Sequence, residues 1–331
     1  MRVLQDDMNP MICLVIPVYK NEANLPDLLA ALIDLSENLI TTLHVAFVVD
    51  GSPDKSYEIL DSKLDDLPFP ATLLLHSRNF GSFAAVRTGF KAVNADYYAV
   101  MAADLQEPTS FIHDATSLLV AETADVVCGE RQDRSDGLWT DLASTTFWAL
   151  YKKFVMPEMP YGGVDIFACN RQFRDVLLAM EEKNSSLIGQ VFWMGFRRKF
   201  VQYIRQRRSI GKSGWTLQKK ITYMLDSIFA FTDLPIRLLM FSGSLALIFS
   251  TVLGLTVIVS KIVGLVVVPG FAMTILVVLF FGSLNIFGLG IVGTYTWRTY
   301  ENTKVRPLTL SRMERTNTIG MRKESETCKA K

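Results

Sequence analysis

Apolar positions in the first 130 residues or so follow two alternating patterns. Short runs rich in β-branched residues predict β-strands, and the segments between them place apolar residues at helical spacing, most clearly in Asn24–Leu35. The expected strands are Ile12–Val18, Val45–Val49, Thr72–Leu75, Tyr97–Ala102 and Val126–Cys128. Strands alternating with helices predict an α/β domain with a mostly parallel sheet and flanking helices.

Two long uncharged runs follow this domain. Leu238–Val259 would extend roughly 33 Å as a helix, which matches the thickness of a bilayer core. A second uncharged run, Phe271–Thr296, comes after a loop that contains Pro269 and Gly270. Two such runs in tandem predict two C-terminal transmembrane helices rather than buried core helices.

The basic residues that flank these runs predict their orientation. Lys and Arg gather before the first run and after the second, whereas the loop between the runs holds only Lys261. The flanking residues are Lys219, Lys220, Arg237, Arg298, Lys304, Arg306, Arg312 and Arg315. By the positive-inside rule we expect both termini, and with them the α/β domain, to face the cytoplasm. The apolar positions of Leu217–Ile228, with lysines opposite them, predict an interfacial helix that leads into the first span. Phe147–Val155 has a similar pattern, for which packing on the sheet is an equal alternative.

Composition narrows the function classes. The 34 basic and 33 acidic residues nearly cancel, so charge gives no support to nucleic-acid binding. Residues Met1–Pro10 lack the apolar stretch of a signal peptide. The four cysteines have no metal-like or paired spacing, which fits a reducing cytosol.

Polar and turn-forming residues follow four of the expected strands. In chain order these segments are Pro17–Glu22, Asp50–Ser52, Arg78–Gly81 and Asp104–Gln106. Each segment alone is typical of a turn or a helix cap. Together they meet at the carboxyl edge of a parallel sheet, where such folds bind their ligands.

The ordered motifs resemble the polyprenyl-phosphate branch of glycosyltransferase family 2, which includes dolichol-phosphate mannose synthase and bacterial undecaprenyl-phosphate sugar transferases. The resemblance runs from roughly Met11 to Pro307. The matching segments are Val15–Glu22, Asp50–Ser52, Asn79–Gly89, Asp104–Pro108, Gly129–Arg131, Arg208–Ser213, Leu234–Arg237 and Gly293–Pro307. It implies a GT-A nucleotide-sugar-binding domain.

The resemblance also implies roles on the donor side. Pro17, Tyr19, Glu22 and Asp50 would hold the base and ribose of the donor nucleotide. Asp104 and Gln106 would bind Mg²⁺ or Mn²⁺, because a hard cation with oxygen ligands neutralises the leaving diphosphate.

The metal motif departs from a common form of the family pattern. Many relatives have an earlier carboxylate where this chain has Ala102. A metal held by Asp104, Gln106 and the donor diphosphate should bind weakly without the nucleotide.

On the acceptor side, Asp165 lies at the position of the acceptor-segment carboxylate, which is usually called the catalytic base. A lipid monophosphate is largely ionised at neutral pH, so orienting the phosphate or supporting charge at the sugar carbon are alternative roles. Arg131, Arg208, Lys212 and Ser213 are expected to bind phosphate. Arg205 and Arg207 are expected to be solvated or membrane-facing charges, and Arg134 is left open.

The sequence therefore predicts an enzyme that transfers a sugar, with inversion, from a nucleotide-sugar to a polyprenyl phosphate. UDP is the expected nucleotide, and relatives suggest a homo-oligomer. The expected divisions are a GT-A domain (1–215), an interfacial helix (216–236), a transmembrane hairpin (237–300) and a cytoplasmic basic tail (301–331). The alternatives are a non-catalytic membrane scaffold or partner subunit and, less favoured, a processive polysaccharide synthase.

Overall fold

The computed structural model describes residues 9–132, 152–153, 156–160, 163–206, 217–263, 270–317 and 319. The chain divides into two compact units. The first comprises Met1–Glu182, Ser186–Thr216 and Pro307–Lys331, and the second comprises Lys183–Ser185 and Leu217–Arg306.

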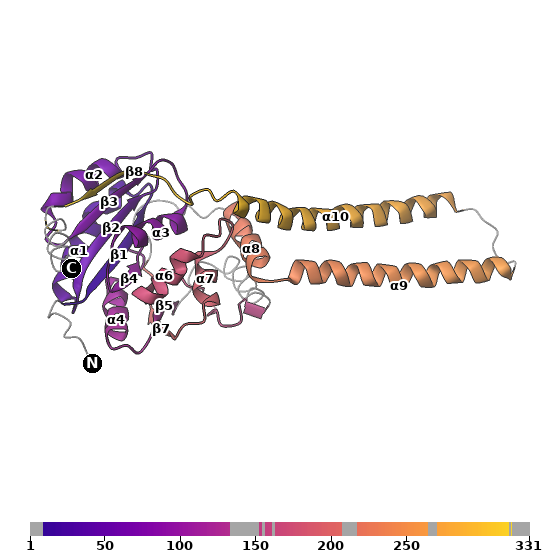
Figure 1. Ribbon diagram of the computed structural model, residues 1–331, viewed down its shortest axis with the longest axis horizontal. Coiled ribbons are helices and arrows are strands. Elements are labelled where there is room, and N and C mark those ends of the chain that lie inside the picture. The colour runs from indigo at the N-terminus through magenta and orange to yellow at the C-terminus, as the bar shows by residue number, and fades with distance from the viewer. Residues whose placement is uncertain are drawn as a thin grey trace. The chain divides into compact units, whose positions relative to one another are not determined.

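The first unit is built on an eight-stranded sheet in the order β7-β5-β6-β4-β1-β2-β3-β8 (Figure 1). The strands are β1 (Met11–Val18), β2 (Thr42–Val49), β3 (Ala71–His76), β4 (Tyr97–Val100), β5 (Val126–Arg131), β6 (Phe167–Asn170), β7 (Arg198–Tyr203) and β8 (Ser311–Thr316). Strands β1 to β4 are mutually parallel, and β5 is parallel to β7. Strand β6 runs antiparallel between β4 and β5, and β8 runs antiparallel to β3. The expected α/β class with a mostly parallel sheet is confirmed, although β4 ends at Val100 rather than Ala102.

Helices cover both faces of this sheet. They are α1 (Leu25–Asn38), α2 (Ser56–Lys63), α3 (Ser82–Ala92), α4 (Thr109–Val120), α6 (Arg171–Ala179) and α7 (Leu187–Trp193), with short 3-10 turns η1 (Glu22–Asn24) and η2 (Leu64–Asp66). The apolar spacing expected for Asn24–Leu35 therefore becomes a helix that begins one residue later. The pattern at Phe147–Val155 lies almost entirely outside the described residues.

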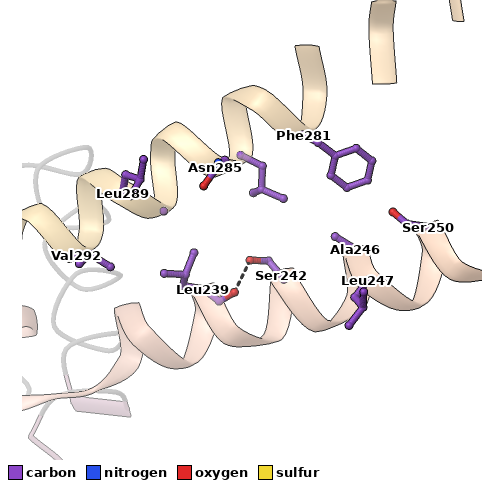
Figure 2. A pocket seen from close by; sticks show the side chains of 12 residues that line it. Leu239, Ser242, Ala246, Leu247, Ser250, Phe281, Asn285, Leu289 and Val292 are labelled. Carbon is purple, nitrogen blue, oxygen red and sulfur yellow. Dashed lines mark hydrogen bonds between the residues drawn. The ribbon is translucent and has the colours of Figure 1, made fainter. Parts of the chain in front are cut away.

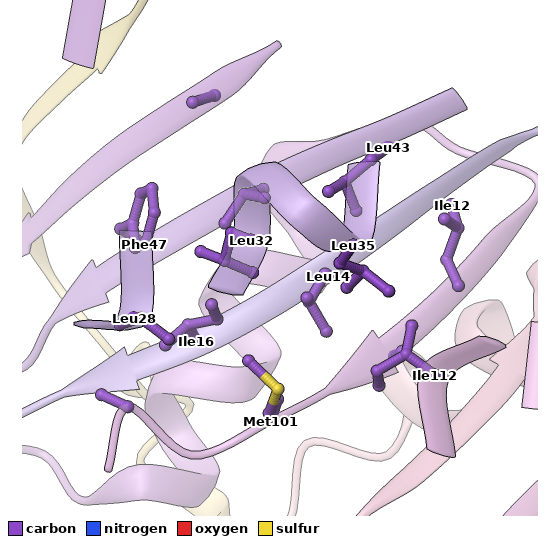
Figure 3. Packing of buried hydrophobic residues seen from close by; sticks show 14 of the residues in the cluster. Ile12, Leu14, Ile16, Leu28, Leu32, Leu35, Leu43, Phe47, Met101 and Ile112 are labelled. Atoms are coloured by element: carbon purple, nitrogen blue, oxygen red, sulfur yellow. The ribbon is translucent and has the colours of Figure 1, made fainter. Parts of the chain in front are cut away.

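One face of β1 forms the centre of the core. Alternate β1 residues, Ile12, Leu14 and Ile16, pack with Leu28 and Leu32 of α1, as Figure 3 shows. All five side chains are fully buried, which is what a period-2 strand beneath an amphipathic helix requires. This packing fixes β1, and so the loop that follows it, in the middle of the sheet.

The opposite face of β1 lies against α3 at very short range. A Cβ placed on Gly89 would lie 2.4 Å from Cγ1 of Val15, so only glycine lets this helix approach the strand. The close packing positions the start of α3, and with it the loop that joins β3 to α3.

The segment after the second long helix contains more structure than the basic tail that the sequence predicts. Residues 301–331 were expected to be a basic tail, but β8 lies in this range and completes the sheet beside β3. Arg315 forms ion pairs with Asp61 and Asp65, and the Asn317 side chain bonds to the main chain at Leu64, Phe69 and Ala71. These contacts tie part of the expected tail into the first unit.

The second unit contains α8 (Leu217–Phe231), α9 (Leu234–Ile262) and α10 (Phe271–Thr303). Both α9 and α10 are long and apolar enough to cross a membrane, and their spanning segments are Leu234–Ser260 and Val277–Thr303. Helices α9 and α10 contain the two uncharged runs. Their apolar side chains are largely exposed, as expected of surfaces that face lipid. On α10, Arg298 donates to the Asp226 carboxylate of α8 at 2.6 Å, which joins those two helices.

A groove of about 520 Å³ lies between α9 and α10 (Figure 2). Small residues such as Ala246 and Gly288 line it, and a Cβ on Gly288 would lie 2.9 Å from Leu239. The Asn285 amide and the Ser250 hydroxyl also line this groove. Small and polar side chains are common where membrane helices pack closely.

Candidate functional site

The parallel strands bring their carboxyl ends to one edge of the sheet. Strands β1, β2, β3 and β4 run in the same direction. Strand β6 is antiparallel to both β4 and β5, so β5 and its parallel neighbour β7 also end at this edge, where β6 begins. The topology therefore gathers the loops after Val18, Val49, His76, Val100, Arg131 and Tyr203, together with Asp165, which precedes β6.

The loops after β1 and β2 are joined by reciprocal hydrogen bonds. The Lys20 amide donates to Ser52 Oγ at 2.8 Å, and the Glu22 amide donates to Asp54 Oδ2 at 3.1 Å. In return the Lys55 amide donates to Glu22 Oε2 at 2.9 Å. Glu22 therefore ties the two loops together, while the Tyr19 ring is 41% exposed and remains accessible to a ligand.

The Asp50 carboxylate is buried and fully engaged with the protein. Oδ1 accepts from the Phe80 amide at 2.8 Å, and Oδ2 accepts from the Gly81 amide at 2.7 Å. Nδ1 of His76 lies 2.8 Å from Oδ1. The structure thus uses Asp50 to hold the β3–α3 loop.

The loop after β4 presents the acidic motif. Leu105 adopts a positive φ of 53°, and the Gln106 amide donates to Asp104 Oδ1 at 3.3 Å, so the two predicted metal ligands lie on one tight turn. The neighbouring Glu107 is only 3% exposed, and its Oε2 accepts from the Ala102 amide. Burial and the nearby Asp165 and Asp104 carboxylates raise the pKa of Glu107 to about 7.

The predicted acceptor carboxylate, Asp165, lies on the other side of Arg205 from this turn. The Tyr203 hydroxyl donates to Asp165 Oδ2 at 3.5 Å, and Arg205 Nη1 lies 3.6 Å from the same oxygen. Arg205 Nη2 donates to Gln106 Oε1 at 2.7 Å. One guanidinium therefore connects the predicted metal turn with the predicted acceptor carboxylate.

The first unit also matches a known family by sequence. A model described as glycosyl transferase family 2 matches residues 13–180, which is more than half of the chain. The chain belongs to glycosyl transferase family 2. The matched region runs from Cys13 of β1 past the end of β6 and includes the turn that carries Asp104. The first unit is therefore a domain of the GT-A type expected from the motifs.

Curated relatives match almost the full length of this family 2 chain. The uncharacterized glycosyltransferase sll0501 of Synechocystis sp. is 29% identical over 90% of this chain and 94% of its own length. The bactoprenol glucosyl transferase of Shigella phage SfX is 28% identical over 89% of this chain and 97% of its own. The undecaprenyl-phosphate 4-deoxy-4-formamido-L-arabinose transferase of Sodalis glossinidius is 27% identical over 89% and 91%.

The surroundings of Arg205 differ from those that the sequence predicts. It was expected to be a solvated or membrane-facing charge, but its side chain is 27% exposed and lies between Gln106 and Asp165. Its Nε–H is buried without a hydrogen-bond partner in the described part of the chain. A buried donor of this kind suits an anionic ligand.

The other predicted phosphate ligands are placed only in part. Arg131 ends β5 opposite Tyr203 of β7, and the next residue, Gln132, donates its amide to the Tyr203 carbonyl at 3.0 Å. Arg131 therefore belongs to the same edge as Asp165. The remaining expected ligands, Arg208, Lys212 and Ser213, lie outside the described residues, as do Arg134 and Arg207.

The donor set at the turn is sparse for a metal ion. Within the described ranges, no group of three or more His, Cys, Asp or Glu side chains is arranged to hold one. Asp104 and Gln106 supply one carboxylate and one amide oxygen. Such a pair fits a hard cation that takes its other ligands from a diphosphate and from water.

Proposed function

We propose that this family 2 chain transfers a sugar from a nucleotide-sugar to a polyprenyl phosphate. The observation that carries the proposal is the grouping of Asp104, Gln106, Asp165 and Arg205 at one edge of the sheet. The chain also has two helices of membrane-spanning length, which suits an acceptor that resides in the bilayer. Its relatives include proteins named for transfer to bactoprenol and undecaprenyl phosphate.

For the donor, we propose a UDP-sugar held by the loops after β1 and β2. The accessible Tyr19 ring and Pro17 would contact the nucleotide, whereas Glu22 and Asp50 would act by holding their loops in place. Asp104 and Gln106 would hold Mg²⁺ or Mn²⁺, which when bound neutralises the donor diphosphate.

For the acceptor, we propose that Arg131 and Arg205, together with Arg208, Lys212 and Ser213, neutralise and hold the lipid phosphate. A phosphate oxygen of the lipid attacks the anomeric carbon, the bond to the nucleoside diphosphate breaks with its electrons passing to the leaving oxygen, and the configuration inverts. Asp165 orients the acceptor through its contacts with Tyr203 and Arg205 rather than removing a proton, because the lipid phosphate is already largely ionised.

The charges beside α9 and α10 support a particular membrane arrangement. We propose that α9 and α10 form a transmembrane hairpin with both chain ends and the catalytic unit in the cytoplasm. Exposed apolar side chains on α8, such as Ile221 and Leu225, suit a helix that lies at the membrane surface. We also propose that the chain forms a homo-oligomer.

An assay of the purified full-length chain tests this function. Nucleotide-sugars are screened against undecaprenyl phosphate with Mg²⁺ or Mn²⁺, and the product is identified by mass. We expect a single added sugar, and we expect Asp104→Ala to abolish transfer while Asp114→Ala, an exposed carboxylate on α4, retains it.

Three results would contradict this proposal. Absence of both transfer and donor hydrolysis in the wild type would indicate a scaffold. A polymeric product would indicate a processive synthase. Unchanged turnover by Asp104→Ala would contradict the role of the turn.

A further inference from the structure

The segment that follows the second membrane-length helix returns to the donor edge of the sheet. Helix α10 ends at Thr303, and β8 begins at Ser311 beside β3. Between them the Leu310 carbonyl accepts from the Ser77 amide at 2.9 Å, directly after β3 ends. Thr309 is thereby placed next to the loop that joins β3 to α3.

From Thr309 a chain of short polar contacts leads into the protein. Its hydroxyl lies 2.9 Å from the Thr88 hydroxyl of α3, and Thr88 Oγ1 lies 2.9 Å from Nε2 of His76. His76 Nδ1 lies 2.8 Å from Asp50 Oδ1. His76 and Asp50 are each only 2% exposed, so this chain is shielded from water at its inner end.

The Asp50 end of this chain has a fixed hydrogen-bond direction. A carboxylate can only accept, so Asp50 takes the Nδ1 proton of His76 and the two amide protons of the β3–α3 loop. The Thr88 hydroxyl has a single proton and three neighbours at hydrogen-bond distance, which are His76 Nε2, the Ala84 carbonyl and the Thr309 hydroxyl. The Thr88 oxygen can accept from Thr309 whichever of the other two neighbours it bonds to by donation. Thr309 therefore helps to orient Thr88, Thr88 helps to orient His76, and His76 orients Asp50.

Asp50 in turn fixes a loop whose backbone is constrained on both sides. Gly81 has a positive φ of 97° where the loop enters α3, and its amide donates to Asp50. A Cβ on Gly51 would lie 2.3 Å from the carbonyl carbon of Arg78, so the β2 and β3 loops touch through their main chains. Arg78 lies above the Phe80 ring at 4.1 Å and is the exposed cation of this loop.

We propose that Thr309, although it follows the membrane helices in sequence, is a positioning residue for nucleotide binding. It acts through Thr88, His76 and Asp50 on the Arg78–Gly81 loop. The inference rests on the proposed function, because it takes the loops at this edge to be the donor site.

Strand β8, which follows Thr309, offers a matched control. Thr316 Oγ1 lies 3.2 Å from Thr72 Oγ1, which in turn lies 2.9 Å from His44 Nε2. This second threonine–threonine–histidine series has the same chemistry, but His44 lies near the start of β2, whereas His76 ends β3 at the opposite edge. Loss of the Thr316 hydroxyl should therefore affect only stability.

The test compares Thr309→Val, Thr309→Ser and Thr316→Val in the full-length chain. Calorimetry measures the dissociation constants of UDP and GDP with Mn²⁺ present, and thermal unfolding is recorded for each variant. We expect Thr309→Val to weaken binding of the wild type's preferred nucleotide by about 3- to 10-fold, the usual effect of losing one hydrogen bond. Thr309→Ser and Thr316→Val should stay within about two-fold of the wild type.

Two failures can be told apart. If the wild type binds neither UDP nor GDP, the proposed function fails and the inference fails with it. If the wild type binds a nucleotide but Thr309→Val and Thr316→Val bind it equally well, Thr309 is not a positioning residue, while the proposed function stands.

Discussion

Arg205 connects the two halves of the candidate site through a single side chain. Its guanidinium donates to Gln106 at 2.7 Å and lies 3.6 Å from the Asp165 carboxylate. A planar fork can hold two oxygen groups at fixed angles, which a lysine ammonium cannot do. In the proposed function, this positive charge would lie between the two phosphate-bearing substrates.

We therefore expect Arg205→Ala to lower kcat/KM for transfer by about 10- to 100-fold, the effect of losing charge-assisted hydrogen bonds. Arg205→Lys should restore only part of the loss, because it keeps the charge without the fork. Steady-state kinetics with both substrates measures the effect. Lys199→Ala, an exposed cation on β7, serves as the control. Equal activity of Arg205→Ala and Lys199→Ala would show that Arg205 has no role in transfer.

At single residues, the sequence predicts chemistry better than it predicts contacts. The ordered motifs select Asp104, Gln106 and Asp165, and the structure places all three at one edge. They do not reveal that Arg205 joins them, because that contact requires β7 to pair with β5 across a long stretch of chain. The motifs also do not reveal that Tyr19 is accessible whereas Asp50 is already engaged by His76 and two main-chain amides.

Elements are predictable where burial leaves a clear pattern. Strands β1 to β5 read as apolar runs because both faces of a central parallel strand are covered. By contrast, β7 (Arg198–Tyr203) and β8 (Ser311–Thr316) lie at the edges of the sheet and carry several charges, so no apolar run marks them. Their places depend on partners far away in the sequence.

Asp125 ties three strands together at the edge opposite the site. Its carboxylate accepts two hydrogen bonds from the Arg197 guanidinium and one from the Asn170 amide group, so it joins the start of β5 to the end of β6 and the start of β7. These strands carry Arg131, Asp165 and Tyr203 to the site at their other ends.

The contacts of Asp125 predict how stability depends on pH. The hydrogen bond from the Arg197 side chain, the largest cause, lowers the pKa of Asp125 below its ordinary value. A lowered folded-state pKa stabilises the protein above the unfolded pKa, near 4, and this stabilisation is lost as the pH falls through the folded value. Asp125→Asn should lower the melting temperature at pH 7 by a few degrees, and the difference from the wild type should shrink below about pH 4. Thermal unfolding at several pH values measures this; a deficit that does not change with pH would contradict the ionic role.

The division of the molecule into units does not follow the order of the chain, because segments far apart in the sequence belong to the same unit. The catalytic unit is interrupted by the helices of the second unit and is completed by Pro307–Lys331. Dividing the chain at points where hydrophobicity changes separates β8 from the sheet that it completes. Hydrophobic pattern alone cannot predict such a return, because pairing along an edge strand is made by main-chain groups that every residue carries.

This arrangement predicts that the first unit needs the segment after α10 in order to be stable. Ending the chain after Arg306 removes the β8 ladder, the Arg315 ion pairs and the buried Asn317 amide, which makes three hydrogen bonds to the main chain. At about 1 kcal/mol for each hydrogen bond, the Asn317 contacts alone amount to about 3 kcal/mol, a large part of the stability of a typical domain. The edge of β3 would also be left open to aggregation.

We expect the chain ending at Arg306 to aggregate or to unfold many degrees below the wild type, and the chain ending at Ile319 to behave like the wild type. Both forms keep α9 and α10, so a difference between them reflects the returning segment rather than loss of these two helices. Size-exclusion chromatography and thermal unfolding in the same detergent compare the two. Equal stability of the two truncated forms would show that the stability of the sheet does not depend on β8. The remaining role of Pro307–Ile319 would then be the proposed effect of Thr309 on nucleotide binding.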